Sequence, residues 1–250
     1  MLQVLETLDK GQNKINENDF VEEFEDYWFR NQAKLDINII SLFKPTDEVQ
    51  LIRKAKIGGK IVINLDDNAI IESAIRFHIF RRPKPIFRNC IYIPLEKPLL
   101  PPNYIEFWGS SEFKSKIYDN ISKENKEKLN EILDKYHNIK KEELIIISQP
   151  KSIGISLYGV IYKNLKEDKH PLLMDDSSHN IKPVDIIRLE KEIIKPRGGG
   201  KLTLNNKKIL LVGCGSVGSI LAPELIKFGI DNITIVDNDF ISTDNIYRHQ

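Results

Sequence analysis

The sequence predicts an α/β protein in which an N-terminal α+β domain precedes the first βαβ unit of a doubly wound parallel sheet. Two observations carry this prediction. After residue 206, an apolar strand pattern, a glycine-rich turn, an amphipathic helix pattern and a second apolar strand pattern follow in order, as in a βαβ unit. Before residue 196, helix and strand patterns are mixed without an internal repeat, which is typical of an α+β domain.

Composition restricts the class of protein. Of the 250 residues, 41% are hydrophobic and 29% are charged, and 37 Lys and Arg stand against 36 Asp and Glu. This balance argues against nucleic acid or an anionic membrane as a partner. No segment approaches the ~20 apolar residues of a membrane span, and no signal peptide opens the chain. With only two cysteines, Cys90 and Cys214, we expect a reducing, cytoplasmic compartment.

The first predicted helix has apolar residues at spacings of about three and four, which is typical of a packing face. Its stripe consists of Phe20, Val21, Phe24, Tyr27 and Trp28. Beyond it, a helix is expected after Asp66 and Asp67, and the charge run of residues 122–143 predicts a solvated helix face. Strands are expected at residues 37–43, 57–65, 91–95, 144–147, 155–162 and 184–189.

A proline and glycine run separates the two regions of the chain. It reads Lys195-Pro196-Arg197-Gly198-Gly199-Gly200-Lys201. Proline interrupts regular structure, and three successive glycines do not hold one conformation cheaply. We therefore expect a domain at residues 1–195, a glycine-rich linker at 196–206 and a second, incomplete domain at 207–250.

The glycine motif after the linker has the spacing of a phosphate-binding turn. It follows a strand predicted at residues 207–212 and opens the second helix pattern. Gly213 permits a sharp turn, Gly215 lets the backbone approach a phosphate, and Gly218 lets the helix lie close to the strand. Free N–H groups at the start of that helix favour an anion.

An acidic residue completes the nucleotide fingerprint. The second strand, at residues 233–236, ends in Asp237, where a carboxylate can accept hydrogen bonds from both ribose hydroxyls. The pattern up to Asp237 fits an ATP-binding enzyme, and it equally fits a nicotinamide- or flavin-dependent oxidoreductase.

The residues after Asp237 separate these two classes. The run Asp237-Asn238-Asp239-Phe240-Ile241-Ser242-Thr243-Asp244-Asn245-Ile246-Tyr247-Arg248-His249 resembles that of the ubiquitin-activating-enzyme-like adenylating enzymes, the ThiF/MoeB family. A dehydrogenase does not need Asn and Arg at this spacing. An enzyme that handles a triphosphate does, because Arg offers a rigid fork of donors and Asn adds amide donors. The resemblance covers residues 207–250.

The resemblance implies a fold, a reaction and partners. The fold is a Rossmann-like ThiF nucleotide-binding domain, and the reaction is ATP- and magnesium-dependent adenylation of the C-terminal carboxylate of a ubiquitin-like or sulfur-carrier protein. A homodimer through the activating domain is usual in the family.

The resemblance also assigns roles to residues of this sequence. Asn245 and Arg248 would meet the phosphates, and Asp237 would hold the ribose. Asp239 would support the local turn or the nucleotide. The loop that binds the nucleotide would be formed by Gly213, Gly215, Ser216 and Gly218.

The sequence departs from the family pattern at three positions. Ser216 replaces a frequent third glycine, Asp244 a frequent serine and His249 a frequent glutamine. The Arg-His ending resembles bacterial members that are fused to a ubiquitin-conjugating-like domain in antiphage operons. In those fusions a linker-type domain precedes the activating domain, and we expect residues 1–195 to correspond to it.

The family also supplies a lysine, a magnesium-binding aspartate and a thioester-forming cysteine, which would lie after Gln250. We therefore expect a truncated chain that is inactive by itself. Independently of catalysis, residues 1–195 could be a docking module that brings a protein substrate to the activating domain.

Other reactive residue types have simpler interpretations. Cys214 is expected to pack within the glycine loop. Cys90 begins an apolar strand, so a buried hydrophobe is favoured over a catalytic thiol. The spacing of His137, His170 and His179 relative to the cysteines is not that of a metal site, and Arg197 is interpreted as a solvated arginine of the linker.

Overall fold

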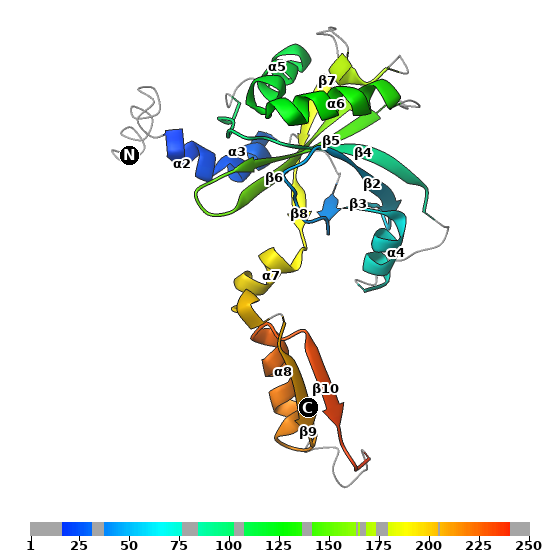
Figure 1. Cartoon of the computed structure of the whole chain (residues 1–250), viewed down its shortest axis with the longest axis vertical. Helices are drawn as coiled ribbons and strands as arrows, with labels where there is room; N and C mark the ends of the chain where they lie inside the picture. The colour runs from blue at the N-terminus through cyan, green and yellow to red at the C-terminus, as the bar shows by residue number, and fades with distance from the viewer. Residues whose placement is uncertain are drawn as a thin grey trace. The chain divides into compact units, whose positions relative to one another are not determined.

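The computed structural model describes residues 17–31, 38–76, 85–102, 108–136, 142–163, 165, 169–173, 180–204 and 206–240. The chain divides into two compact units, residues 1–187 and residues 188–250. Figure 1 labels the helices and strands of both. No helix among the described residues is both long and apolar enough to cross a membrane.

The first unit is built on an eight-stranded mixed sheet. Its strands are β1 (Ile39–Ser41), β2 (Gln50–Ile57), β3 (Lys60–Asn64), β4 (Phe87–Pro94), β5 (Glu142–Pro150), β6 (Ile155–Lys163), β7 (Asn180–Val184) and β8 (Ile186–Arg188). They lie in the order β7-β6-β5-β4-β2-β3-β1-β8. The pairs β4–β5 and β1–β3 are parallel, and β2–β3, β2–β4, β5–β6 and β6–β7 are antiparallel.

Helices cover one face of this sheet. They are α3 (Phe24–Asn31), α4 (Asp67–Arg76), α5 (Ser110–Asn120) and α6 (Lys123–Lys135), and the short helix α2 (Glu17–Glu22) precedes α3. The helices α5 and α6 lie side by side over the strands (Figure 1). Ser122 caps α6 by accepting a hydrogen bond from the Asn125 N–H, which satisfies one free donor of its first turn.

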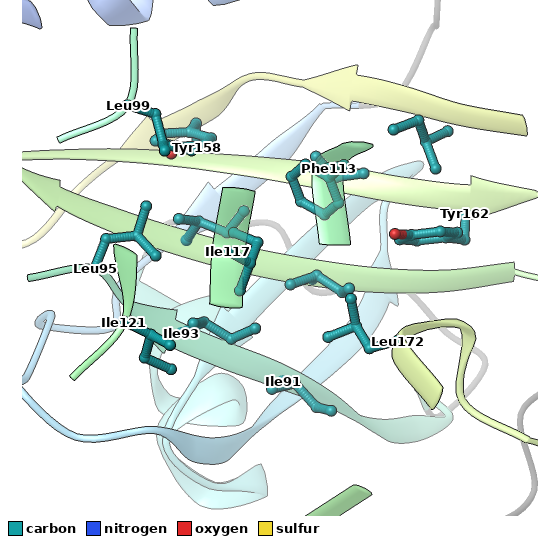
Figure 2. Packing of buried hydrophobic residues seen from close by; sticks show 14 of the residues in the cluster. Ile91, Ile93, Leu95, Leu99, Phe113, Ile117, Ile121, Tyr158, Tyr162 and Leu172 are labelled. Atoms are coloured by element: carbon teal, nitrogen blue, oxygen red, sulfur yellow. The ribbon is translucent and has the colours of Figure 1, made fainter. Parts of the chain in front are cut away.

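Two large apolar clusters form on opposite faces of the strands. In β5, Ile145 and Ile147 join the cluster that also contains side chains of α3, α5 and α6, whereas Leu144 and Ile146 join the second cluster. Figure 2 shows Phe113 and Ile117 of α5 beside the strands within the first cluster. The continuous apolar run of β5 is therefore buried on both faces, which confirms its prediction as a buried strand.

The second cluster consists, among the described residues, of strand residues and Phe43. Strands from both ends of the sheet, β7 and β8, contribute to it. Since β7 ends at Val184 and β8 begins at Ile186, these two end strands are joined by one residue, so the sheet must curve to bring its ends together.

The structure corrects three local expectations. The strand expected at 57–65 is a hairpin: Gly58 and Gly59 have φ of 58° and 83° and form the turn between β2 and β3, as a two-residue hairpin loop requires. The first helix is divided at Glu23 into α2 and α3. The charge run of 122–143 is not one helix, because α6 ends at Lys135 and Glu143 is buried in β5.

The second unit contains the βαβ element that the sequence predicts. It runs from β9 (Lys208–Val212) through α8 (Gly218–Lys227) to β10 (Asn232–Val236). The two strands are parallel, in a register that pairs Lys208 with Asn232 and Val212 with Val236. The mixed α/β fold class is thereby confirmed.

The run expected to be a linker has regular structure. Residues up to Arg197 belong to α7 (Lys191–Arg197), and η2 (Leu202–Leu204) is a short 3-10 helix. Gly199 has φ of 82°, and the Gly200 N–H bonds to the Lys195 carbonyl at 2.8 Å. Glycine in this conformation is a helix C-terminal cap, so here the glycines end a helix.

The end of α7 is attached to the rest of the second unit. The Lys195 ammonium lies 2.6 Å from the Asp231 carboxylate and donates to the Gly229 carbonyl at 3.0 Å. The Lys201 N–H also bonds to the Phe228 carbonyl at 2.8 Å. These contacts hold the segment after α7 beside the start of β10.

Candidate nucleotide-binding site

The glycine loop connects β9 to α8. Gly213 has φ of 88°, a left-handed conformation that other residues adopt only with strain. Its N–H bonds to the Val236 carbonyl at 2.8 Å, so the β9–β10 ladder continues one residue beyond the strands before the chain turns away.

Gly218 and Gly215 meet opposite steric demands. A Cβ on Gly218 would lie 2.0 Å from the Gly213 carbonyl oxygen, so only glycine allows α8 to begin this close to the turn. A Cβ on Gly215 would have no heavy atom within 4 Å. The space above Gly215 is therefore open, as the approach of a phosphate to the backbone requires.

The start of α8 presents backbone donors. The Ser219 N–H bonds to the Gly215 carbonyl at 2.9 Å and the Leu221 N–H to the Val217 carbonyl at 2.9 Å. For the N–H groups of Gly215, Ser216 and Val217, the described part of the chain provides no acceptor. Together with the helix dipole, such donors favour an anion.

Asp237 lies next to this loop at the end of β10. One carboxylate oxygen accepts the Cys214 N–H and the other accepts the Asp239 N–H at 2.9 Å. The Asp239 carboxylate in turn accepts the Phe240 N–H at 2.8 Å. The Asp239 side chain therefore bonds within its own turn, and its role at the nucleotide stays a prediction.

The structure brings together six of the eight expected site residues in the loop and at the end of β10: Gly213, Gly215, Ser216, Gly218, Asp237 and Asp239. Asn245 and Arg248 lie outside the described residues. Sequence reasoning missed the backbone N–H of Cys214 as a partner of Asp237, and no residue pattern signals it because any residue supplies this donor.

Cys90 is a buried residue of β4. Its side chain has no exposed surface, and burial raises the pKa of its thiol to about 12. A thiol with this pKa is almost entirely protonated at neutral pH and is a poor nucleophile. The interpretation of Cys90 as a buried hydrophobe is confirmed. Cys214 is half-buried.

The remaining candidates do not gather at the glycine loop. His170 is buried in the first unit, and His137 and His179 lie outside the described residues. Over the ranges that the structure describes, no three His, Cys, Asp or Glu side chains form a group that could hold a metal ion. Arg197 is exposed at the end of α7.

Comparison with known proteins connects this loop to one family. Residues 191–250 match the ThiF family, so the match begins at α7 and includes the whole βαβ unit. Its start lies within three residues of the start of the second unit at residue 188. The supposed linker therefore belongs to the matched segment.

Three curated relatives support the match. The ATP-dependent ubiquitin transferase-like protein Cap2 of Pseudomonas aeruginosa is 30% identical over 146 residues, 54% of this chain and 24% of the relative. The adenylyltransferase and sulfurtransferase UBA4 of Candida glabrata is 43% identical over 58 residues, covering 22% of this chain and 13% of the relative.

A third relative, the adenylyltransferase and sulfurtransferase MOCS3 of Danio rerio, is 32% identical over 80 residues, 31% of this chain and 17% of the relative. The chain thus spans a quarter or less of each of these proteins. The C-terminal segment of the chain is thus similar to the ThiF/MoeB-type family of ubiquitin-activating-like proteins, and the relatives that it resembles include the bacterial Cap2 type.

Proposed function

We propose that the second unit contributes the nucleotide site of an enzyme that adenylates the C-terminal carboxylate of a ubiquitin-like or sulfur-carrier protein with ATP. The observation that supports this most directly is the glycine loop, where open space over Gly215 meets backbone N–H groups without an acceptor in the described part of the chain. The names of the relatives, adenylyltransferase and ATP-dependent ubiquitin transferase-like protein, favour ATP as the nucleotide.

Each site residue has a proposed task in this reaction. The loop formed by Gly213, Gly215, Ser216 and Gly218 binds phosphate oxygens through its backbone. Asp237 accepts the ribose hydroxyls through its carboxylate, which can accept several hydrogen bonds at once. Asn245 and Arg248 hold the phosphates, where a guanidinium stabilises the charge of the departing pyrophosphate.

Adenylation joins the modifier carboxylate to the α-phosphorus of ATP as the bond to pyrophosphate breaks. The chain contributes mainly by positioning the phosphates and stabilising charge, as in phosphoryl transfer generally. Magnesium is proposed as the companion of the phosphates. Its ligand is expected beyond the described residues, as the resemblance to the family implies.

The first unit is proposed to act on the protein substrate. It would be a linker-type or docking domain that presents the modifier, or its target, to the ThiF-type unit. The chain shares 30% identity with Cap2 over a segment longer than the ThiF match, so we propose that it is of the same fusion type and has a role in antiphage defence. We further propose that it acts in the cytoplasm as a homodimer and that it binds neither nucleic acid nor a membrane.

The alternative is a nicotinamide- or flavin-dependent oxidoreductase. The loop geometry and Asp237 fit a dinucleotide as well as ATP. The ThiF match and the run that includes Asn245 and Arg248 favour the adenylating enzyme. Calorimetry with ATP and NAD on a polypeptide that completes the doubly wound sheet separates the two, and tighter NAD binding would reverse this ranking.

A matched pair of glycine substitutions tests the loop itself. Gly215→Ala should leave the fold intact, because its Cβ has free space, and should weaken ATP binding at least about tenfold by filling the approach to the phosphate. Gly218→Ala should instead disturb the β9–α8 junction, because its Cβ meets the Gly213 carbonyl. Circular dichroism and calorimetry on both variants check this, and undiminished ATP binding by the folded Gly215→Ala protein would argue against a phosphate at this loop.

A further inference from the structure

The Asp237 carboxylate joins two segments of the second unit. One oxygen bonds to Cys214 of the glycine loop, and the other bonds to Asp239 of the turn after β10. We infer that Asp237 is a positioning residue that holds the glycine loop in its nucleotide-binding shape before any nucleotide arrives. This inference rests on the proposed function, which assigns the ribose hydroxyls to Asp237, and it adds a second task for the same carboxylate.

The end of the β9–β10 ladder shows why such a residue is needed. The last strand pair is Val212 with Val236, and the Gly213 N–H adds one further bond to the Val236 carbonyl. Gly213 then turns into a left-handed conformation, so the next donor, the Cys214 N–H, points away from the regular ladder. The Asp237 side chain supplies the acceptor that the neighbouring strand no longer offers.

The position of Cys214 matters because the loop has little freedom elsewhere. Gly218 leaves no room between the start of α8 and the Gly213 carbonyl. The Ser219 N–H bonds to the Gly215 carbonyl at 2.9 Å. With the loop fixed at both of these points, the bond at Cys214 determines how the segment between them is oriented, and this segment carries the donors proposed for the phosphate.

A charged acceptor suits this task. Hydrogen bonds to an ionised group are shorter and stronger than neutral ones, and a carboxylate offers about four lone-pair sites for its two backbone donors. This capacity of a carboxylate allows it to accept ribose hydroxyls while it holds the loop. In Asp237→Asn, the side chain has one acceptor oxygen, and its amide nitrogen would face a backbone N–H donor. The amide therefore cannot accept both the Cys214 N–H and the Asp239 N–H.

The first experiment needs no nucleotide and uses the chain as it is. Amide hydrogen exchange is measured at Cys214 in the parent chain, Asp237→Asn, Asp237→Ala and the control Asp239→Ala, which keeps Asp237. We expect exchange at Cys214 to become at least about tenfold faster in Asp237→Ala, to increase in Asp237→Asn, and to stay unchanged in the control. Unchanged exchange at Cys214 in Asp237→Ala would overturn the inference.

The second experiment separates positioning from ribose binding. In a polypeptide that completes the sheet, affinities for ATP and 2′,3′-dideoxy-ATP are measured for the parent and for Asp237→Asn. A positioning residue lowers both affinities, whereas a residue that binds only ribose lowers the affinity for ATP alone. If Asp237→Asn weakened binding of ATP but not of 2′,3′-dideoxy-ATP, the inference would be overturned. If the parent binds neither nucleotide, the proposed function fails, and exchange at Cys214 still decides whether Asp237 holds the loop.

Discussion

His170 is a histidine held in its neutral form by the first unit. Its side chain has no exposed surface, Nδ1 accepts the Leu172 N–H at 3.2 Å, and the ring packs edge-on against Tyr136 with centroids 5.5 Å apart. Burial, with a smaller contribution from the charge of Lys54, lowers the pKa of His170 to about 3. Between pH 6.5 and 3, the unfolded chain binds a proton at this position that the folded chain does not.

Folding stability should therefore fall as the pH is lowered through this window. From pH 7 to pH 5, His170 should cost about 2 kcal/mol of unfolding free energy. Glu143 acts in the opposite direction, because burial raises the pKa of its carboxyl and its protonation favours the folded state as the pH falls. The two effects have to be separated by substitution.

His170→Asn provides that separation, because its amide oxygen can replace Nδ1 as the acceptor for Leu172. The variant should have a lower free energy of unfolding than the parent at pH 7. Between pH 7 and pH 5, however, its free energy of unfolding should fall by about 2 kcal/mol less than that of the parent. Urea unfolding at the two pH values measures this. Equal losses in both proteins would mean that His170 is not neutral in the folded state.

Arg248 lies outside the described residues, and its role is tested by turnover. In a polypeptide that completes the site, Arg248→Ala should reduce modifier-dependent ATP–pyrophosphate exchange about a hundredfold, the effect of removing one donor to transition-state charge. Asn245→Ala should reduce the exchange rate by a smaller factor, because a neutral hydrogen-bond donor stabilises charge less than a charged donor does. A folded Arg248→Ala protein that exchanges at the parental rate would remove most of the case against an oxidoreductase.

Residues whose role depends on backbone geometry could be predicted from sequence. Gly213 and Gly218 stand where a positive φ and a close helix contact exclude side chains, and the motif encodes both requirements. The burial of Cys90 followed from its apolar neighbours. The contact of Lys54 with Glu143, at 3.6 Å, could not be predicted, because it joins strands that are far apart in the sequence.

At the scale of elements, the aromatic stripe of α3 packs against β6 and β7 as a core face. Trp28 is buried between Phe24 and Tyr158, with ring centroids 5.4 and 4.6 Å from its own. Its indole N–H lies within hydrogen-bonding distance of the Gly159 carbonyl at 3.1 Å and the Val184 carbonyl at 3.2 Å. One donor thereby attaches the helix to two adjacent strands.

Trp28→Phe should destabilise the chain by about 1–3 kcal/mol, because it leaves buried carbonyls without this donor while keeping an aromatic ring. Trp28→Ala should cost more, about 3–5 kcal/mol, because the ring is also lost. Urea unfolding of the three proteins measures the difference. If Trp28→Phe matched the parent, the indole N–H would contribute nothing to the attachment of α3.

Elements with strong apolar patterns were predictable, and elements with mixed patterns were not. β5 contains a continuous apolar run, β6 alternates Ile, Leu and Val with Ser and Tyr, and both strands were expected. β2 carries three basic residues among eight, and it becomes a strand because it pairs with β3 on one side and β4 on the other. The helix end within the glycine run could not be predicted, because a glycine run can either cap a helix or loosen a chain, and only its hydrogen bonds distinguish the two.

At the scale of the whole chain, the described apolar clusters all lie in the first unit, between Phe24 and Ile186. In the second unit, Ala222 and Ile230 are the buried hydrophobic residues among those described, whereas Leu210 and Val212 of β9 are 63% and 74% exposed. Since burial of apolar surface is the main source of stability, we propose that the first unit unfolds as a separate and more stable body.

A pair of mild core substitutions tests this proposal. Ile146→Val removes one methyl group from the buried face of β5 and should cost about 1 kcal/mol. The slowest exchanging amides of β4 and β5 should then exchange about fivefold faster, because about 1.4 kcal/mol corresponds to a factor of ten. Amides of β9 and β10 should keep their parental rates, since sub-global opening is confined to a cooperative unit.

The reciprocal change is Ala222→Gly, which weakens α8 by about 1 kcal/mol through helix propensity. It should accelerate exchange in α8 and in β9, which α8 contacts, and leave exchange in β4 and β5 unchanged. The exchange rates of individual amides, measured by NMR in both variants and in the parent, test these expectations. If Ile146→Val accelerated β9 and β10 as much as β4 and β5, the two units would open together, and the boundary near residue 188 would not divide the chain into separate folding units.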